Sequence, residues 1–203
     1  MRTFYLFIFL FIFSNVNAQF FEKLSIDAHF GGRSGGTHSP GSTLKNDIHF
    51  DGGLLYKIDS LIYIRGGLSF DKFKTTKDNS IDNALLIGLS IQLVAEIMPI
   101  QSGSSKFGLN FHTGFGLSTM YNPNYKVGKE FNDPGIKGND DMINVIIGLT
   151  PRYKINDKIS INLDLVTTAL LKQNSYVDME FDSKANNKPG SIINIAIGAT
   201  YKF

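Results

Sequence analysis

The chain has 203 residues and no cysteine, so disulfides, thiolate nucleophiles and cysteine-ligated metal centres are excluded. Its 20 basic and 18 acidic residues leave a formal net charge of +2, a balance that argues against nucleic acid as a partner. The length fits one domain, and 20 glycines without any helical periodicity of the apolar residues favour short strands and turns.

The first predicted element is a cleaved signal peptide over residues 1–18. Arg2 precedes an apolar run that ends at Phe13, and Val16 and Ala18 place small side chains at the positions recognised during cleavage. The alternative, a permanent helical anchor, needs about 20 apolar residues to cross hydrocarbon, and this run is shorter. We therefore expect an exported protein.

Eight segments of the predicted mature domain, residues 19–203, alternate between apolar residues on one parity and polar or small residues on the other. This period of two is typical of strands with two different faces. The segments span residues 23–30, 47–58, 62–71, 84–93, 107–118, 144–154, 159–168 and 193–203. The predicted fold class is all-β, an eight-stranded antiparallel up-and-down transmembrane β-barrel.

Charged residues within these segments lie on the polar parity, which predicts that the apolar parity faces lipid. A charge facing lipid near the midplane costs about 2 to 4 kcal/mol, whereas a charge in the lumen can find a partner. Lys72 and Lys74 depart from the rule near a strand end, where lysine can snorkel to the interface. The alternative, a lipocalin-like carrier, would need a more polar outer face. The charges that follow the rule are Asp27, Asp51, Lys57, Arg65, Asp71, Arg152, Lys154, Asp164 and Lys202.

The connections alternate between long and short, the pattern of outer-membrane barrels with long external loops and short periplasmic turns. The long ones, residues 31–46, 121–141 and 171–190, are rich in Gly, Asn, Ser and Asp and provide the surface for an external ligand. The short ones are Asp59–Ser60 and residues 156–158. An even number of strands places both chain ends on the periplasmic side.

Two features concern strand ends. Pro151 lacks a backbone donor, and we expect a bulge or the end of a strand there. Aromatic residues near segment ends suit the girdles at the two membrane interfaces. These residues are Phe30, Tyr56, Phe70, Tyr153, Tyr201 and Phe203.

Residues 22–203 resemble the amino-terminal barrel of OmpA-type outer-membrane proteins, particularly Bacteroidota-type members. The likeness is strongest in residues 148–159, which read GLTPRYKINDKI, and in residues 63–74. The resemblance implies a location in the outer membrane and insertion by the barrel-assembly machinery. The chain stops at the barrel, whereas full-length members continue into a peptidoglycan-binding domain, so tethering to the cell wall is not carried over.

The final residues, GATYKF, are similar to the terminal-strand signal that the assembly machinery reads. In this signal we assign roles to Gly198, Tyr201 and the terminal aromatic Phe203.

Four charges on lumen parity come from different segments and balance in sign: Asp51, Arg65, Arg152 and Asp164. Because buried charges persist when they are paired and hydrogen-bonded, we predict a network of ion pairs in the lumen. The interior of an eight-stranded barrel is just filled by side chains, so a wide pore is not expected.

The histidines are candidates for catalytic or metal-binding roles. His29, His49 and His112 fall on lumen parity, where a neutral imidazole satisfied by neighbouring groups is the favoured interpretation. Barrel enzymes of the lipid A deacylase type use a His and a Ser two positions apart, so that the base can activate the nucleophile. Here each of the three is followed two residues later by glycine or aspartate. We expect no catalytic residue, cofactor or metal.

The predicted function is that of an integral outer-membrane barrel with a structural or surface-interaction role. It would be a monomer with long external loops and a polar lumen filled by side chains. The alternatives are a small porin-like channel and, less favoured, an enzyme acting on outer-membrane lipids.

Overall fold

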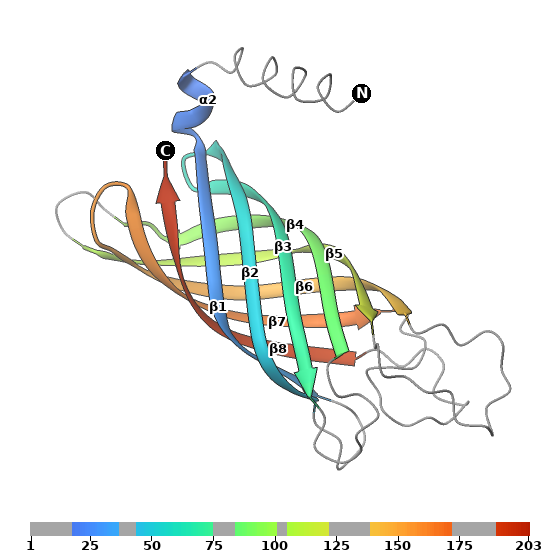
Figure 1. Ribbon diagram of the computed structural model, residues 1–203. Coiled ribbons are helices and arrows are strands. Elements are labelled where there is room, and N and C mark those ends of the chain that lie inside the picture. Colours follow the sequence, from blue (N-terminus) through green and yellow to red (C-terminus); the bar gives the residue numbers. More distant parts are fainter. Residues whose placement is uncertain (1–17, 37–43, 75–83, 101–104, 122–138, 172–189) are drawn as a thin grey trace, which may run out of the picture.

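The computed structural model describes residues 18–36, 44–74, 84–100, 105–121, 139–171 and 190–203. Eight antiparallel strands follow one another around a closed barrel, and β1 pairs with β8 to complete the ring (Figure 1). The predicted fold class is confirmed. The strands are β1 (Leu24–Gly36), β2 (Leu44–Asp59), β3 (Ile62–Lys74), β4 (Ala84–Met98), β5 (Phe107–Tyr121), β6 (Asn139–Lys154), β7 (Ile159–Leu171) and β8 (Gly190–Lys202).

A short helix, α2 (Ala18–Glu22), precedes β1 at the end of the barrel where β8 finishes (Figure 1). No helix in the described part of the chain is long and apolar enough to cross a bilayer. Most of the predicted signal peptide, residues 1–17, lies outside the described residues.

Two short turns at this end are organised by side-chain oxygens. The Oδ1 atom of Asn156 accepts hydrogen bonds from the backbone N–H groups of Lys158 and Ile159, at 2.9 and 2.8 Å. Asp59 likewise accepts from the N–H of Ser60 at 2.6 Å. Asn and Asp favour tight turns because their short side chains replace a backbone acceptor.

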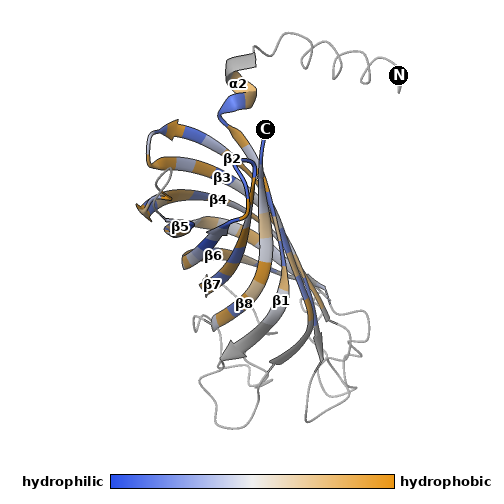
Figure 2. Cartoon of the chain, turned by 90° about the vertical axis from the view of Figure 1, so that its left-hand side faces the viewer, coloured by the Kyte–Doolittle hydropathy of each residue, from blue (hydrophilic) through white to orange (hydrophobic). Residues whose placement is uncertain are grey.

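Apolar side chains of the strands point outward. Ile91 and Phe115 are 70% and 69% exposed, although each lies near the middle of its strand, β4 and β5 respectively. Figure 2 shows hydrophobic and hydrophilic residues alternating along the strands. The outward-facing parity is therefore the apolar one, as predicted, and the lipocalin-like alternative is excluded.

Several strands extend farther than the alternating pattern indicated. β1 continues to Gly36 and β2 begins at Leu44, so residues 31–36 and 44–46 belong to strands and not to the predicted loop 31–46. Glycines carry no side-chain pattern, yet their backbone keeps the ladder with β8, where Gly35 pairs with Ile192. Residues 122–138 and 172–189, most of the other two predicted loops, lie outside the described residues.

The predicted bulge or strand end at Pro151 is wrong. Pro151 lies within β6 and pairs with Leu109 of β5 without a change of register. On the β7 side the paired positions skip from Leu149 to Arg152, again with the register kept. The missing N–H of Pro151 interrupts the hydrogen-bonded ladder with β7 at this point, but the pairing with β5 is kept and β6 continues to Lys154.

Aromatic rings gather near the end of the barrel that carries α2. Phe107 and Tyr153 have their ring centroids 5.0 Å apart, and Tyr201 and Phe203 have theirs 5.3 Å apart. Phe20 stacks on Tyr56 at 5.2 Å. Four of the predicted girdle residues, Tyr56, Tyr153, Tyr201 and Phe203, thus lie at this end of the barrel, and their place at a membrane interface stays a prediction.

Candidate functional site

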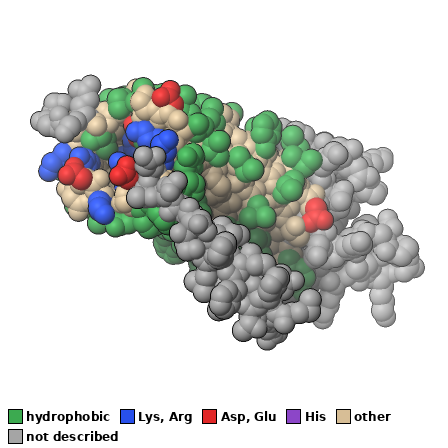
Figure 3. All heavy atoms as spheres, turned by 90° about the horizontal axis from the view of Figure 1, so that it is seen from above, with side chains coloured by type: hydrophobic (Ala, Val, Ile, Leu, Met, Phe, Trp, Pro, Cys, Tyr) green, Lys and Arg blue, Asp and Glu red, His purple; other side chains and the backbone are tan. Residues whose placement is uncertain are grey.

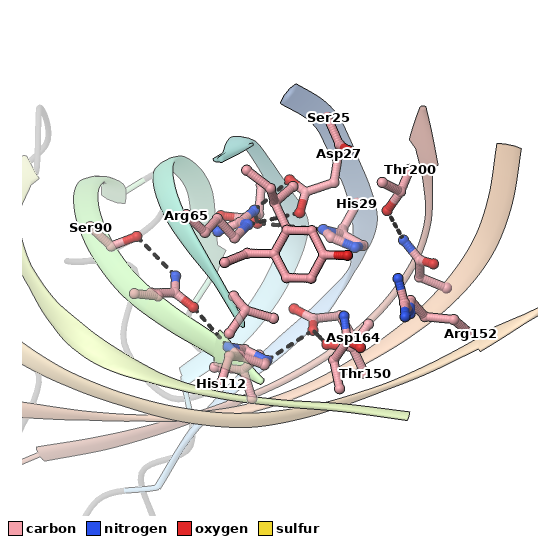
Figure 4. A pocket seen from close by; sticks show the side chains of 18 of the residues that line it. Ser25, Asp27, His29, Arg65, Ser90, His112, Thr150, Arg152, Asp164 and Thr200 are labelled. Atoms are coloured by element: carbon pink, nitrogen blue, oxygen red, sulfur yellow. Dashed lines mark hydrogen bonds and ion pairs between the residues drawn. The ribbon is translucent and has the colours of Figure 1, made fainter. Parts of the chain in front are cut away.

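The candidate site is a cavity of about 280 Å³ inside the barrel, lined by side chains from all eight strands. Its wall is built by the polar parity, which points inward on every strand because side chains alternate faces along a strand. Ionic and amide groups dominate the part drawn in Figure 4.

Arg65 of β3 is the centre of the principal ion cluster. Its Nε and Nη2 atoms donate to the two carboxylate oxygens of Asp27, each at 2.8 Å, and Nη2 also donates to Asp51. The arginine is only 6% exposed. Paired N–H groups on one carboxylate fix its geometry as well as its charge, so Arg65 ties β1 and β2 to β3 inside the lumen (Figure 4).

Two glycines make room for this guanidinium. Gly53 and Gly67 face each other across β2 and β3. A Cβ atom at Gly53 would lie 2.7 Å from Arg65 Cζ, and one at Gly67 would lie 2.5 Å from Nη1. Any larger residue at either position would displace the arginine.

Two lumen histidines also lie against glycines. His29 of β1 pairs with Gly198 of β8, and a Cβ at that glycine would overlap the imidazole ring. His112 of β5 pairs with Gly148 of β6 in the same relation. Each ring therefore fills the space that a side chain on the neighbouring strand would otherwise take.

The partners of these two histidines differ. His112 Nδ1 lies 2.7 Å from Gln92 Oε1, and its Nε2 lies 3.3 Å from Asp164 Oδ1. His29 is 4% exposed, and its Nδ1 lies 3.5 Å from Asp51 Oδ1. Among the described residues, neither ring nitrogen of His29 has a hydrogen-bond partner.

Besides the cluster around Arg65 and the one around His112 and Asp164, a third cluster lies nearer the α2 end. Arg152 Nη2 donates to Glu96 Oε1 at 2.6 Å, and the Tyr63 hydroxyl donates to the same oxygen at 3.1 Å. A separate pair, His49 and Asp71, lies at 2.6 Å with both side chains at most 1% exposed.

The four residues predicted to form one network are thus divided among three clusters. Only Asp51 and Arg65 contact each other; within the described part of the chain, no hydrogen bond or ion pair joins Arg152 or Asp164 to them. Sequence reasoning missed Asp27 and Glu96 as partners. Asp27 lay on lumen parity, which was the available signal, but Glu96 lies beyond the end of the predicted segment 84–93.

The loop end of the lumen contains an apolar layer. Leu170 and Ile192 are 0% exposed, and Leu86 and Met142 are 1% and 2% exposed. All four lie on lumen parity near the ends of their strands opposite α2. The lumen at this end is therefore filled by buried apolar side chains together with the His49–Asp71 pair, because Asp71 pairs with Leu86 across β3 and β4.

Asp27, His29 and Asp51 are the described residues grouped closely enough to hold a cation, with ligand atoms within 4.8 Å of one another. Arg65 already donates to both carboxylates, so it supplies the positive charge that a metal would bring. In the neighbouring cluster, the Thr150 hydroxyl donates to Asp164 Oδ1 at 2.7 Å, the same oxygen that lies 3.3 Å from His112 Nε2.

No family model and no curated protein sequence matches the chain. Several solved structures are similar to it. Neisserial surface protein A aligns with a TM-score of 0.61 at 9% identity, over 89% of this chain and 97% of that one. The chain has the fold of small outer-membrane barrels. The attachment invasion locus protein Ail of Yersinia pestis gives 0.52 at 11% identity, over 89% and 97%. A major outer-membrane protein of Thermus thermophilus gives 0.52 at 10% identity, over 89% and 99%.

Proposed function

We propose that this protein is an integral barrel of a bacterial outer membrane, where it serves as a scaffold that displays loops for surface interactions. The observation that carries the proposal is the belt of outward apolar side chains on a closed barrel, with large hydrophobic residues up to 70% exposed. In water such a surface would aggregate, whereas in a bilayer its apolar side chains contact lipid tails and are not exposed to water.

The lumen favours a scaffold over a transport pathway. Arg65 and its two carboxylates occupy the lumen beside β1, β2 and β3, and Leu170 and Ile192 lie at the loop end with no exposed surface. A diffusion pathway would require both the ion cluster and the apolar layer to move. We therefore favour the structural role over the porin-like alternative, and expect flat current in single-channel recordings at high protein load.

The finer parts of the proposal rest on the sequence. They are export with removal of residues 1–18, insertion by the assembly machinery, a monomeric state, and membership of the OmpA-type barrels. The supporting features are the apolar leader, the terminal GATYKF and the GLTPRYKINDKI segment.

The deciding experiment is expression of the full chain in a Gram-negative host, followed by gel migration of boiled and unboiled outer-membrane fractions. A closed barrel that resists detergent migrates differently before and after boiling. Recovery of a soluble periplasmic protein, or equal migration of the two samples, would contradict the proposal.

Orientation can be tested in the same strain. An epitope inserted within residues 122–138 should be labelled on intact cells, because the proposal makes this connection external. An epitope in the turn at Asn156–Lys158 should be labelled only after the outer membrane is permeabilised. The reverse pattern would show that the barrel is inserted the other way round.

A further inference from the structure

Six lysines surround the mouth of the barrel at the α2 end, in three cross-strand pairs. The backbone N–H of Lys57 donates to the carbonyl of Lys23, that of Lys154 to Lys106, and that of Lys202 to Lys158, each at 2.8 Å. Figure 3 shows Lys and Arg side chains gathered at one end of the barrel. We call these residues the mouth lysines: Lys23, Lys57, Lys106, Lys154, Lys158 and Lys202.

The mouth lysines continue the inward parity of their strands. Lys202 lies two residues after Thr200, and Lys154 two residues after Arg152, both of which line the cavity. Lys154, Lys158 and Lys202 themselves belong to the cavity wall. Lys154, Lys158 and Lys202 therefore border the entrance of the lumen, and parity alone assigns Lys23, Lys57 and Lys106 to the same face.

Acidic side chains lie at the same end of the barrel (Figure 3), but most of the mouth lysines form no ion pair with them in the described part of the chain. Lys154 forms an ion pair with Asp157 at 2.6 Å, and among the described residues no other mouth lysine forms one. The Nζ atom of Lys57 lies 5.8 Å from the ring centroid of Tyr63, and that of Lys158 lies 5.8 Å from the ring centroid of Tyr201. Like charges directly opposite each other on neighbouring strands destabilise a sheet, and this arrangement repeats three times around one mouth.

We propose that the mouth lysines form a binding site for a soluble ligand that carries adjacent phosphate groups. Such a ligand supplies closely spaced negative charge that matches paired ammonium groups. Lysine binds phosphate oxygens as a compact point charge, so paired ammonium groups suit a ligand with adjacent phosphates. The arginine nearest the mouth, Arg152, is already bound to Glu96.

The inward parity favours a soluble ligand over a lipid headgroup. Headgroups lie outside the barrel wall, next to aromatic residues such as Tyr153 and Phe203, which are 40% and 45% exposed. Binding to the purified barrel does not depend on the proposed membrane role, so the two can fail separately.

The test is calorimetric titration of the folded barrel in an uncharged detergent with inorganic tripolyphosphate and, separately, with monophosphate. Tripolyphosphate should bind at least about tenfold more tightly, and added salt should weaken binding because the contacts are exposed. The double variant Lys158→Gln/Lys202→Gln should lose about tenfold in affinity. The matched control Lys72→Gln removes one lysine from β3 far from this mouth and should bind like the unchanged protein.

Each variant is first checked for its heat-dependent gel shift, so that loss of folding is not mistaken for loss of binding. Equal affinity of the double variant and the unchanged protein would overturn the proposal, as would an equal loss in Lys72→Gln. The titration is repeated in phosphatidylcholine vesicles with and without phosphatidylglycerol. If the anionic lipid abolishes tripolyphosphate binding, or if binding occurs only to that lipid, the site is one for headgroups and the soluble ligand is excluded.

Discussion

Replacement of Arg65 by methionine should strongly destabilise the barrel. The substitution keeps much of the side-chain volume but removes two hydrogen bonds to Asp27 and one to Asp51. Two carboxylates, 6% and 14% exposed, would then remain in the lumen without their cation. Breaking a buried pair in this way costs about 3 to 5 kcal/mol, because the desolvation of the remaining charge is no longer compensated.

This loss can be measured by equilibrium urea unfolding of the refolded barrel in detergent, with the heat-dependent gel shift reporting the folded fraction. The control is Lys154→Met, which removes a pair whose Asp157 partner is 95% exposed. An exposed pair contributes little to stability, so the control should unfold close to the unchanged protein. Equal unfolding midpoints for Arg65→Met and the control would refute the reasoning.

A triple variant separates the loss of the arginine from the stranding of its partners. In Asp27→Asn/Asp51→Asn/Arg65→Met no charge remains in the cluster, so most of the lost stability should return. If the triple variant is as unstable as Arg65→Met alone, the penalty comes from packing and not from the unpaired carboxylates.

Three further predictions concern packing, the lipid face and assembly. Gly148→Ala should destabilise by about 1 to 3 kcal/mol because its Cβ overlaps the facing imidazole, whereas Gly66→Ala, with nothing within 4 Å, should be close to neutral in the same urea assay. Ile91→Lys, at the middle of β4, should make the free energy of insertion into vesicles less favourable by about 2 to 4 kcal/mol. Ile155→Lys, at the barrel end, should cost about 0 to 1 kcal/mol, and equal costs for the two variants would contradict a lipid-facing belt. Deletion of Phe203 should reduce the heat-shifted form in outer-membrane fractions, and undiminished insertion would argue against its assigned role in assembly.

The strands and their inward faces could be predicted because alternation is a local property of the sequence. Residues 31–36 could not be assigned to a strand, since glycines lack the side chains that reveal the pattern, although their backbone pairs with β8. Pro151 was misjudged for a related reason: the loss of one donor was visible in the sequence, but the ladder with β5 that holds the strand in place was not.

Partners within the lumen depended on register, which the sequence left open. Asp27 reaches Arg65 because of the register of β1, β2 and β3. Asp27 of β1 pairs with Gly53 of β2, and Gly53 in turn pairs with Gly67 of β3. A change of two residues in either pairing would give Arg65 a different acceptor. The apolar layer at the loop end was missed because leucine and isoleucine on lumen parity were few among many polar residues.

The pairing of His29 with Gly198 has a consequence for the register in which the barrel closes. It spans the seam between the first and last strands, the junction in the ring that no turn between consecutive strands defines. A slip of two residues would set the imidazole against Ala196 or Thr200, where a Cβ already occupies the space it needs. The His29 ring therefore fits in only one register between β1 and β8. Strands paired in another register could not close the ring without a clash at this position.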